Sequence, residues 1–115
     1  MAQNASAVQA DLVPAVVHQV IRLVAPQAPQ RLQSDHQLIG DLGFHSLALA
    51  ELGFTLEDLF RLDSITPERA MALRTVEDIV DLIGNALAQG AAELPATAEV
   101  ETLCAQYGTV WNPAA

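Results

Sequence analysis

The sequence predicts an all-α fold: a small bundle of three main helices and one short helix, with a long first loop. Apolar residues recur at helical spacing in three segments, and no segment alternates apolar and polar residues as a strand would. The chain is 51% hydrophobic but only 4% aromatic, which indicates an aliphatic core and favours helices over sheets. Its 115 residues suit one domain with one core.

The N-terminal segment, residues 1–10, is small and polar and predicts a disordered lead. The first helix is expected over residues 12–24, because valines recur there at steps of three, one, three and four. Asp11 is the expected N-cap, and Pro14 is tolerable in the first turn. Residues 25–45 carry two prolines and two glycines without a regular period. They predict a long loop, which in a small domain usually has a function.

The second helix, expected over residues 46–61, has two distinct faces. One face is an apolar stripe that we assign to the core: Leu49, Leu52, Leu56, Leu59 and Phe60. The opposite face combines acidic residues with large apolar ones: Leu47, Ala50, Glu51, Phe54, Glu57 and Asp58. Its carboxylates are most simply explained as a solvated helix face, without acid–base chemistry.

Two more helices follow. Thr66 as N-cap and Pro67 at the first helical position predict a short helix that ends near Met71. Thr75 then caps the last helix, and Asp78 lies three residues further on, as in an approximate capping box. Apolar residues keep the helical period beyond this cap.

Gly90 is well placed to end this helix, so the predicted domain covers residues 11–90. Residues 91–115 form an Ala-rich extension, either a linker or a segment with a short helix through Val100, Leu103, Cys104 and Tyr107. Trp111 either packs back on the bundle, lies in a disordered tail or contacts a partner. Cys104 is the single cysteine, so it forms no internal disulfide and is interpreted as a small buried apolar residue of a protein from a reducing compartment.

The charge of the chain restricts its partners. Fourteen acidic and five basic residues give a net charge of −9, and every basic residue is an arginine. Nucleic acids and anionic membranes attract Lys/Arg patches, so this surface favours neither and suits proteins with basic patches. No apolar run is long enough to span a bilayer and no secretion signal is visible, which predicts a cytoplasmic protein.

Several enzyme classes are disfavoured by the motifs. The three histidines lack metal-ligand spacing, so no metal site is expected. The order Gly43-Phe44-His45-Ser46-Leu47 does not match the G-x-S-x-G elbow of serine hydrolases, and no P-loop or G-x-G-x-x-G is present.

Ser46 leaves two interpretations open. As an N-cap, its hydroxyl would stabilise the second helix by about 1 kcal/mol. At the same position, a phosphate ester on the hydroxyl would be favoured by free N–H groups and by the positive end of the helix dipole.

Residues 12–88 resemble the acyl carrier protein family. The resemblance is carried by two stretches, SDHQLIGDLGFHSLALAELGFTLEDLFRLDSITPE and LRTVEDIVDLI. In that family, a serine that opens the second helix receives 4′-phosphopantetheine. Each matching element is weak alone, but their order and spacing are specific: Asp35, Leu38, Asp41-Leu42-Gly43, Ser46-Leu47, Glu51-Leu52, Leu56-Glu57, Phe60 and Thr75-Val76.

The resemblance implies that Ser46 is the attachment site, modified by a phosphopantetheinyl transferase that uses Mg²⁺ and coenzyme A. The arm would hold acyl intermediates as thioesters for polyketide or fatty-acid-like biosynthesis, and the carrier, a monomer, would catalyse nothing itself. Leu73 falls where the family often has an aliphatic residue beside the arm. Partner enzymes with basic patches, such as an acyltransferase or ketosynthase, would read one face of the second helix: Leu47, Glu51, Phe54, Glu57 and Asp58.

His45 departs from the Asp-Ser-Leu pattern of acyl carriers. His-Ser-Leu resembles the peptidyl carrier domains of nonribosomal peptide synthetases, although these usually have Gly-Gly-His-Ser and this chain has Gly-Phe-His-Ser. A peptidyl carrier is therefore the alternative. A third interpretation is an unmodified acidic adaptor in which Ser46 is only a cap.

Overall fold

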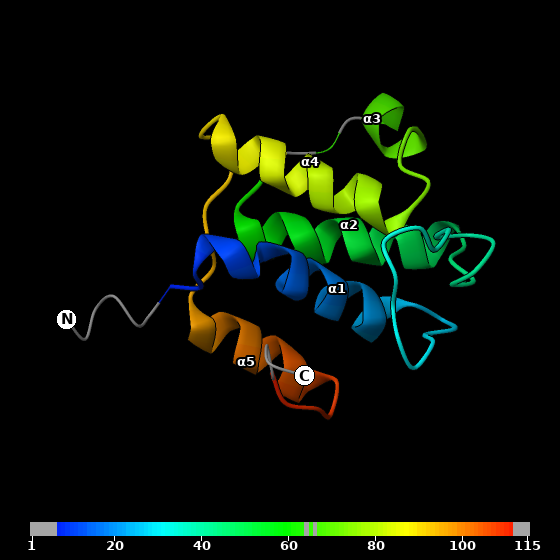
Figure 1. Ribbon diagram of the computed structural model, residues 1–115, viewed down its shortest axis with the longest axis horizontal. Helices are drawn as coiled ribbons and strands as arrows, with labels where there is room; N and C mark the ends of the chain where they lie inside the picture. Colours follow the sequence, from blue (N-terminus) through cyan, green and yellow to red (C-terminus); the bar gives the residue numbers. More distant parts are fainter. Residues whose placement is uncertain (1–6, 64, 66, 112–115) are drawn as a thin grey trace.

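The computed structural model describes residues 7–63, 65 and 67–111. Within these ranges the chain is helical, without strands, and confirms the predicted all-α bundle. The elements are a 3₁₀ turn η2 (Ala10–Leu12), α1 (Val13–Val24), α2 (Ser46–Phe60), the short α3 (Pro67–Met71), α4 (Val76–Ala88) and α5 (Thr97–Gln106). Figure 1 shows α4 and α5 on opposite sides of the pair formed by α1 and α2. No helix of the described part is long and apolar enough to cross a bilayer.

The central element is α1, which contacts both α2 and α4. Its apolar positions recur every three or four residues, and Val16, Val17, Val20 and Ile21 are fully buried. The α2 stripe packs against them through Leu52, Leu56, Leu59 and Phe60, as predicted, whereas Leu49 is only partly buried. Leu49 remains available to line a surface cavity, which is described below.

The start of α1 differs from the prediction. Asp11 lies inside η2, and Leu12 occupies the N-cap position of α1 without a side-chain hydrogen bond. The physical reason is Pro14, which lies three residues after Asp11 and has no N–H to donate to an Asp11 side chain. The prediction of Asp11 as the N-cap was therefore wrong.

Part of the expected disordered lead belongs to the core. Val8 is only 3% exposed, and its N–H donates to the carbonyl of Pro95 at 2.9 Å. Ala7 and Ala96 form an isolated antiparallel bridge beside it. The residues before Ala7 lie outside the described part of the chain. A single buried valine in a polar segment gives no periodic signal, so the sequence pattern did not show this contact.

The long first loop is tied to the start of α4. The Leu38 N–H donates to the Arg74 carbonyl at 2.9 Å, and the Val76 N–H donates to the His36 carbonyl at 3.1 Å. Leu38 itself is 2% exposed. These contacts fix the loop across the bundle from α1 to α4, so the segment that leads into α2 has a defined position.

Both predicted helices after α2 are present. The short helix α3 ends at Met71 as expected, although its predicted cap Thr66 lies outside the described residues. At α4, Thr75 accepts the Asp78 N–H at 3.2 Å, and Asp78 accepts the Thr75 N–H at 3.1 Å, which confirms the capping box. The N–H groups of Arg74 and Thr75 hold the pKa of Asp78 below its usual value.

The C-terminal extension forms a helix that packs on the bundle. Val100 and Cys104 of α5 are 1% and 0% exposed and belong to the main hydrophobic core. Trp111 is partly buried against the same core, so it packs back on the bundle. The possible short helix is therefore present, and the buried Cys104 fits its interpretation as a small apolar residue.

We predict that Val100→Ala lowers the free energy of unfolding by about 2 kcal/mol, since it removes two buried methyl groups and leaves a cavity. Val110→Ala is the matched control, because Val110 is 78% exposed and the same change there should stay within about 0.5 kcal/mol. Chemical denaturation of both variants measures the difference. Equal stability of the two variants would show that α5 does not share the core.

Candidate functional site

Ser46 is the first residue of α2, and His45 precedes it as the N-cap. His45 has an extended backbone, with φ −124° and ψ 179°, and its Nδ1 accepts the Ala48 N–H at 3.4 Å. The prediction that Ser46 is itself the cap was therefore wrong by one residue. Because the histidine ring already supplies the cap, the Ser46 hydroxyl is not required for it, and the Ser46 side chain is exposed.

The turn before His45 is fixed by the loop. Leu42 and Phe44 are buried at 0% and 3% exposure, and the Leu42 carbonyl accepts the Gln27 N–H at 3.0 Å. Gly43 between them has φ +73°, and a Cβ there would lie 3.1 Å from the Gln27 side chain. The positive φ favours glycine here, and the Gln27 side chain would have to shift slightly to admit a Cβ. This anchoring delivers Ser46 to the surface at a defined point.

Asp41 has a structural role in the same turn. Its Oδ2 accepts the Gln37 N–H at 2.7 Å, and its own N–H donates to the Gln37 carbonyl at 2.9 Å. The motif residues Asp41, Gly43 and His45 therefore shape the loop and cap the helix. They hold Ser46 in place through the backbone.

The start of α2 is electrostatically suited to a phosphate on Ser46. The first N–H groups of a helix have no carbonyl partner within it and carry the positive end of the dipole. No acidic residue lies in the first turn of α2. A phosphate diester on the exposed hydroxyl at this position would lie near these free N–H groups and would meet no carboxylate of the first turn.

The predicted partner face lies along one side of α2. Leu47 and Phe54 are 75% and 70% exposed, and Glu51 and Asp58 are also exposed. Glu57 differs, since it is half-buried and its Oε2 accepts the Ile65 N–H at 2.9 Å. Glu57 therefore ties the segment between α2 and α3 to the helix, in addition to its place on this face.

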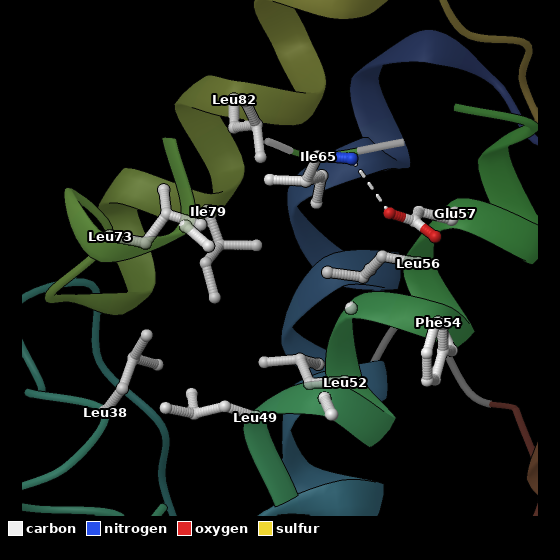
Figure 2. Close-up of a pocket in the computed structure, with 13 residues that line it drawn as sticks. Leu38, Leu49, Leu52, Phe54, Leu56, Glu57, Ile65, Leu73, Ile79 and Leu82 are labelled. Carbon is white, nitrogen blue, oxygen red and sulfur yellow. Dashed lines mark hydrogen bonds between the residues drawn. The ribbon is translucent and has the colours of Figure 1, made fainter. Parts of the chain in front are cut away.

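An apolar cavity of about 260 Å³ opens between α2 and the α3–α4 region. Figure 2 shows leucine and isoleucine side chains around it from the first loop, α2 and α4. Leu73 lines the cavity, and so does Leu49, three residues after Ser46. The other large apolar lining residues, which are labelled there, are Leu38, Leu52, Phe54, Leu56, Ile65, Ile79 and Leu82. The cavity therefore extends within one turn of Ser46.

A glycine in the middle of α2 contributes to this cavity. Gly53 lines it, and a Cβ added there would meet nothing within 4 Å. A helix-interior glycine costs about 0.5–1 kcal/mol relative to alanine, and here neither a positive φ nor a close neighbour requires it. The sequence signal that could have revealed the cavity is this glycine inside a strong helical pattern.

Two side-chain contacts join the C-terminal helix α5 to α2, one at Glu51 of the partner face and one at Arg61, the C-cap of α2. The Tyr107 hydroxyl donates to Glu51 Oε2 at 2.7 Å. At the other end of α2, Arg61 donates to both carboxylate oxygens of Glu99, at 2.9 and 3.4 Å, and holds the pKa of Glu99 below its usual value. Burial and the Glu51 carboxylate raise the pKa of Tyr107. The sequence pattern did not reveal these contacts, which join residues far apart in the chain.

Comparison with known families places the chain in one of them. The family model described as phosphopantetheine attachment site matches residues 15–83 of the chain. This range contains most of α1, all of α2 and α3, most of α4 and the exposed serine at the start of α2, and it ends before α5. No curated protein matches the chain significantly. Among the described residues, no group of three or more His, Cys, Asp or Glu side chains could hold a metal ion.

We predict that Tyr107 ionises above the ordinary tyrosine pKa of about 10. Tyr107 is the only tyrosine, so ultraviolet absorbance follows its titration directly. Because the folded-state pKa is raised, the contact stabilises the fold below pH 10, and this stability is lost as the pH rises through the folded-state value. Glu51→Gln should lower the midpoint, with the burial effect remaining. A wild-type midpoint at or below the ordinary value would contradict the contact.

Proposed function

The chain belongs to the acyl carrier protein family, whose members hold 4′-phosphopantetheine covalently, and we propose that Ser46 is the residue that carries this group. The observation that supports this is the exposed Ser46 side chain at the first residue of α2, inside the matched range. When bound, the group supplies a thiol at the end of a flexible arm, which holds the cargo. Members of this family are generally non-catalytic, and we propose the same for this chain.

The chain's own residues position the attachment point. The His45 ring accepts the capping hydrogen bond at the N-terminus of α2, so the Ser46 hydroxyl is not needed for capping. The backbone N–H groups at that end would stabilise the phosphate of the bound group, and the buried Leu42 and Phe44 keep the turn fixed. A phosphopantetheinyl transferase therefore meets an accessible hydroxyl on a rigid support. Leu73 and Leu49 offer the arm or its cargo an apolar surface close to Ser46.

The apolar cavity favours an acyl cargo. Nearly all of its lining residues are apolar, with Glu57 as the exception. Burying a methylene group stabilises by about 0.8 kcal/mol, whereas an aminoacyl ammonium would lose hydration there. We therefore propose acyl intermediates of polyketide or fatty-acid-like biosynthesis. The alternative is a peptidyl carrier of a nonribosomal peptide pathway, which the His45-Ser46-Leu47 sequence favours.

The partners proposed for this face are enzymes with basic patches, such as a phosphopantetheinyl transferase, an acyltransferase or a ketosynthase. Glu51 and Asp58 present carboxylates on the exposed side of α2, beside the exposed Phe54. A carrier has to release each enzyme after transfer. Attraction between exposed charges suits this requirement, since it speeds association and is weakened by salt.

We expect that incubation with coenzyme A, Mg²⁺ and a transferase of broad specificity adds the mass of one phosphopantetheine to the chain. Ser46→Ala should abolish the gain. Ser34→Ala is the matched control, because Ser34 is an exposed loop serine of the same size, and it should be modified like the wild type. Intact-protein mass spectrometry measures all three. Modification that persists in Ser46→Ala would refute the assignment.

The cargo proposal is tested by filling the cavity. In the wild type, loading a medium-length acyl chain should raise the melting temperature above that of the unloaded carrier, because buried methylene groups stabilise the fold. Gly53→Leu should remove this increase, since its side chain occupies the cavity. Gly84→Leu in α4 is the control: its Cβ also meets nothing within 4 Å, but Gly84 does not line the cavity, so the increase should remain. A larger increase with an aminoacyl cargo would favour the peptidyl carrier.

A further inference from the structure

A groove runs between α2 and α5. It consists of two adjoining hollows of about 330 and 630 Å³, which share Thr55, Asp58, Leu103 and Gln106 as lining residues. One wall belongs to α2, within the range matched by the family model, and the other belongs to α5, beyond it. The groove is therefore specific to a chain that carries the α5 extension.

The α5 wall is anchored in the hydrophobic core of the bundle. Its Val100 and Cys104 side chains are buried in the main core, so α5 cannot leave without exposing them. The two contacts with α2 pair Arg61 with Glu99 and Glu51 with Tyr107. Because residue numbers rise along one helix as they fall along the other, the helices run antiparallel and are joined near both ends of the groove.

The lining of the groove is acidic and partly apolar. Asp58 and Glu57 contribute carboxylates on the α2 side, and none of the described residues that line either hollow is basic. Phe54 and Tyr107 lie at one end, 70% and 40% exposed, and Leu103 lies partly buried on the floor. An occupant that complements this surface has basic side chains beside an apolar stripe.

We propose that α2 and α5 together form a docking groove for a basic amphipathic helix of a partner enzyme. The proposal rests on the partner face of α2 described above and adds α5 as its second wall. The apolar side of the partner helix covers Phe54 and Leu103, while its Arg or Lys side chains pair with Asp58 and Glu57. Both hollows are open to solvent, so a partner helix laid along them can contact α2 and α5 at the same time.

The test uses the full chain, isotopically labelled for NMR, and a synthetic amphipathic peptide of arginine and leucine as the probe. Amide shifts are expected on both walls, over residues 54–58 and 102–107. A peptide of the same composition, scrambled to remove the apolar stripe, should bind at least about tenfold more weakly, because charge alone contributes only part of the affinity.

The α5 wall is tested by a pair of charge changes. Thr102 and Gln106 line the groove and are exposed, so Thr102→Arg with Gln106→Arg should raise the Kd for the peptide about tenfold or more through repulsion. Asn85→Arg with Gln89→Arg adds the same charge at the same spacing near the end of α4 and should change the Kd less than about twofold.

Four results would overturn the inference: no binding of the probe, shifts confined to α2, equal affinity for the scrambled peptide, or equal loss in the two double variants. Ser46→Ala should bind the probe like the wild type, because Ser46 does not line the groove. A failure of the attachment assignment is therefore distinguishable from a failure of the docking groove.

Discussion

The burial of α1 is the constraint on which the rest of the structure depends. Its fully buried side chains face both α2 and α4, so α1 holds those two helices at a fixed separation. The apolar cavity beside Ser46 lies between α2 and the α3–α4 region, and its width follows from that separation. The loop that delivers Ser46 crosses from α1 to α2 and is itself fastened to the start of α4 by Leu38. A small aliphatic core thus positions the attachment serine and the space next to it.

The helices could be predicted from the sequence because their apolar residues repeat with the period that burial on one side requires. The capping box of Thr75 and Asp78 was predictable for a similar reason, since both partners lie within one turn. Features that join distant residues left no such local signal. The cap at His45 depends on how the loop enters the helix, and Val8, Tyr107 and the groove depend on where α5 packs.

The candidate site also has parts that could be predicted from the sequence and parts that could not. The exposed serine and the acidic face were predictable, because helical spacing alone places the face on one side of α2. The cavity was not, because its lining comes from the first loop, α2, α4 and the segments between them. Gly53 is a feature of the cavity that is visible in the sequence. It weakens the helix locally, and the room that it leaves lies beside the space that we propose for the cargo.

Ser46 and Asp58 lie on one uninterrupted helix, and this has a consequence for recognition. Twelve residues at 1.5 Å of rise per residue separate them by about 18 Å along the axis. The helix therefore fixes the distance between the serine and the acidic end. An enzyme that grips the acidic end already has the serine at a known distance and direction from its own surface, so little orientational freedom remains to be lost when the hydroxyl enters the active site. The spacing between an enzyme's basic residues and its catalytic centre is then set by the length of α2.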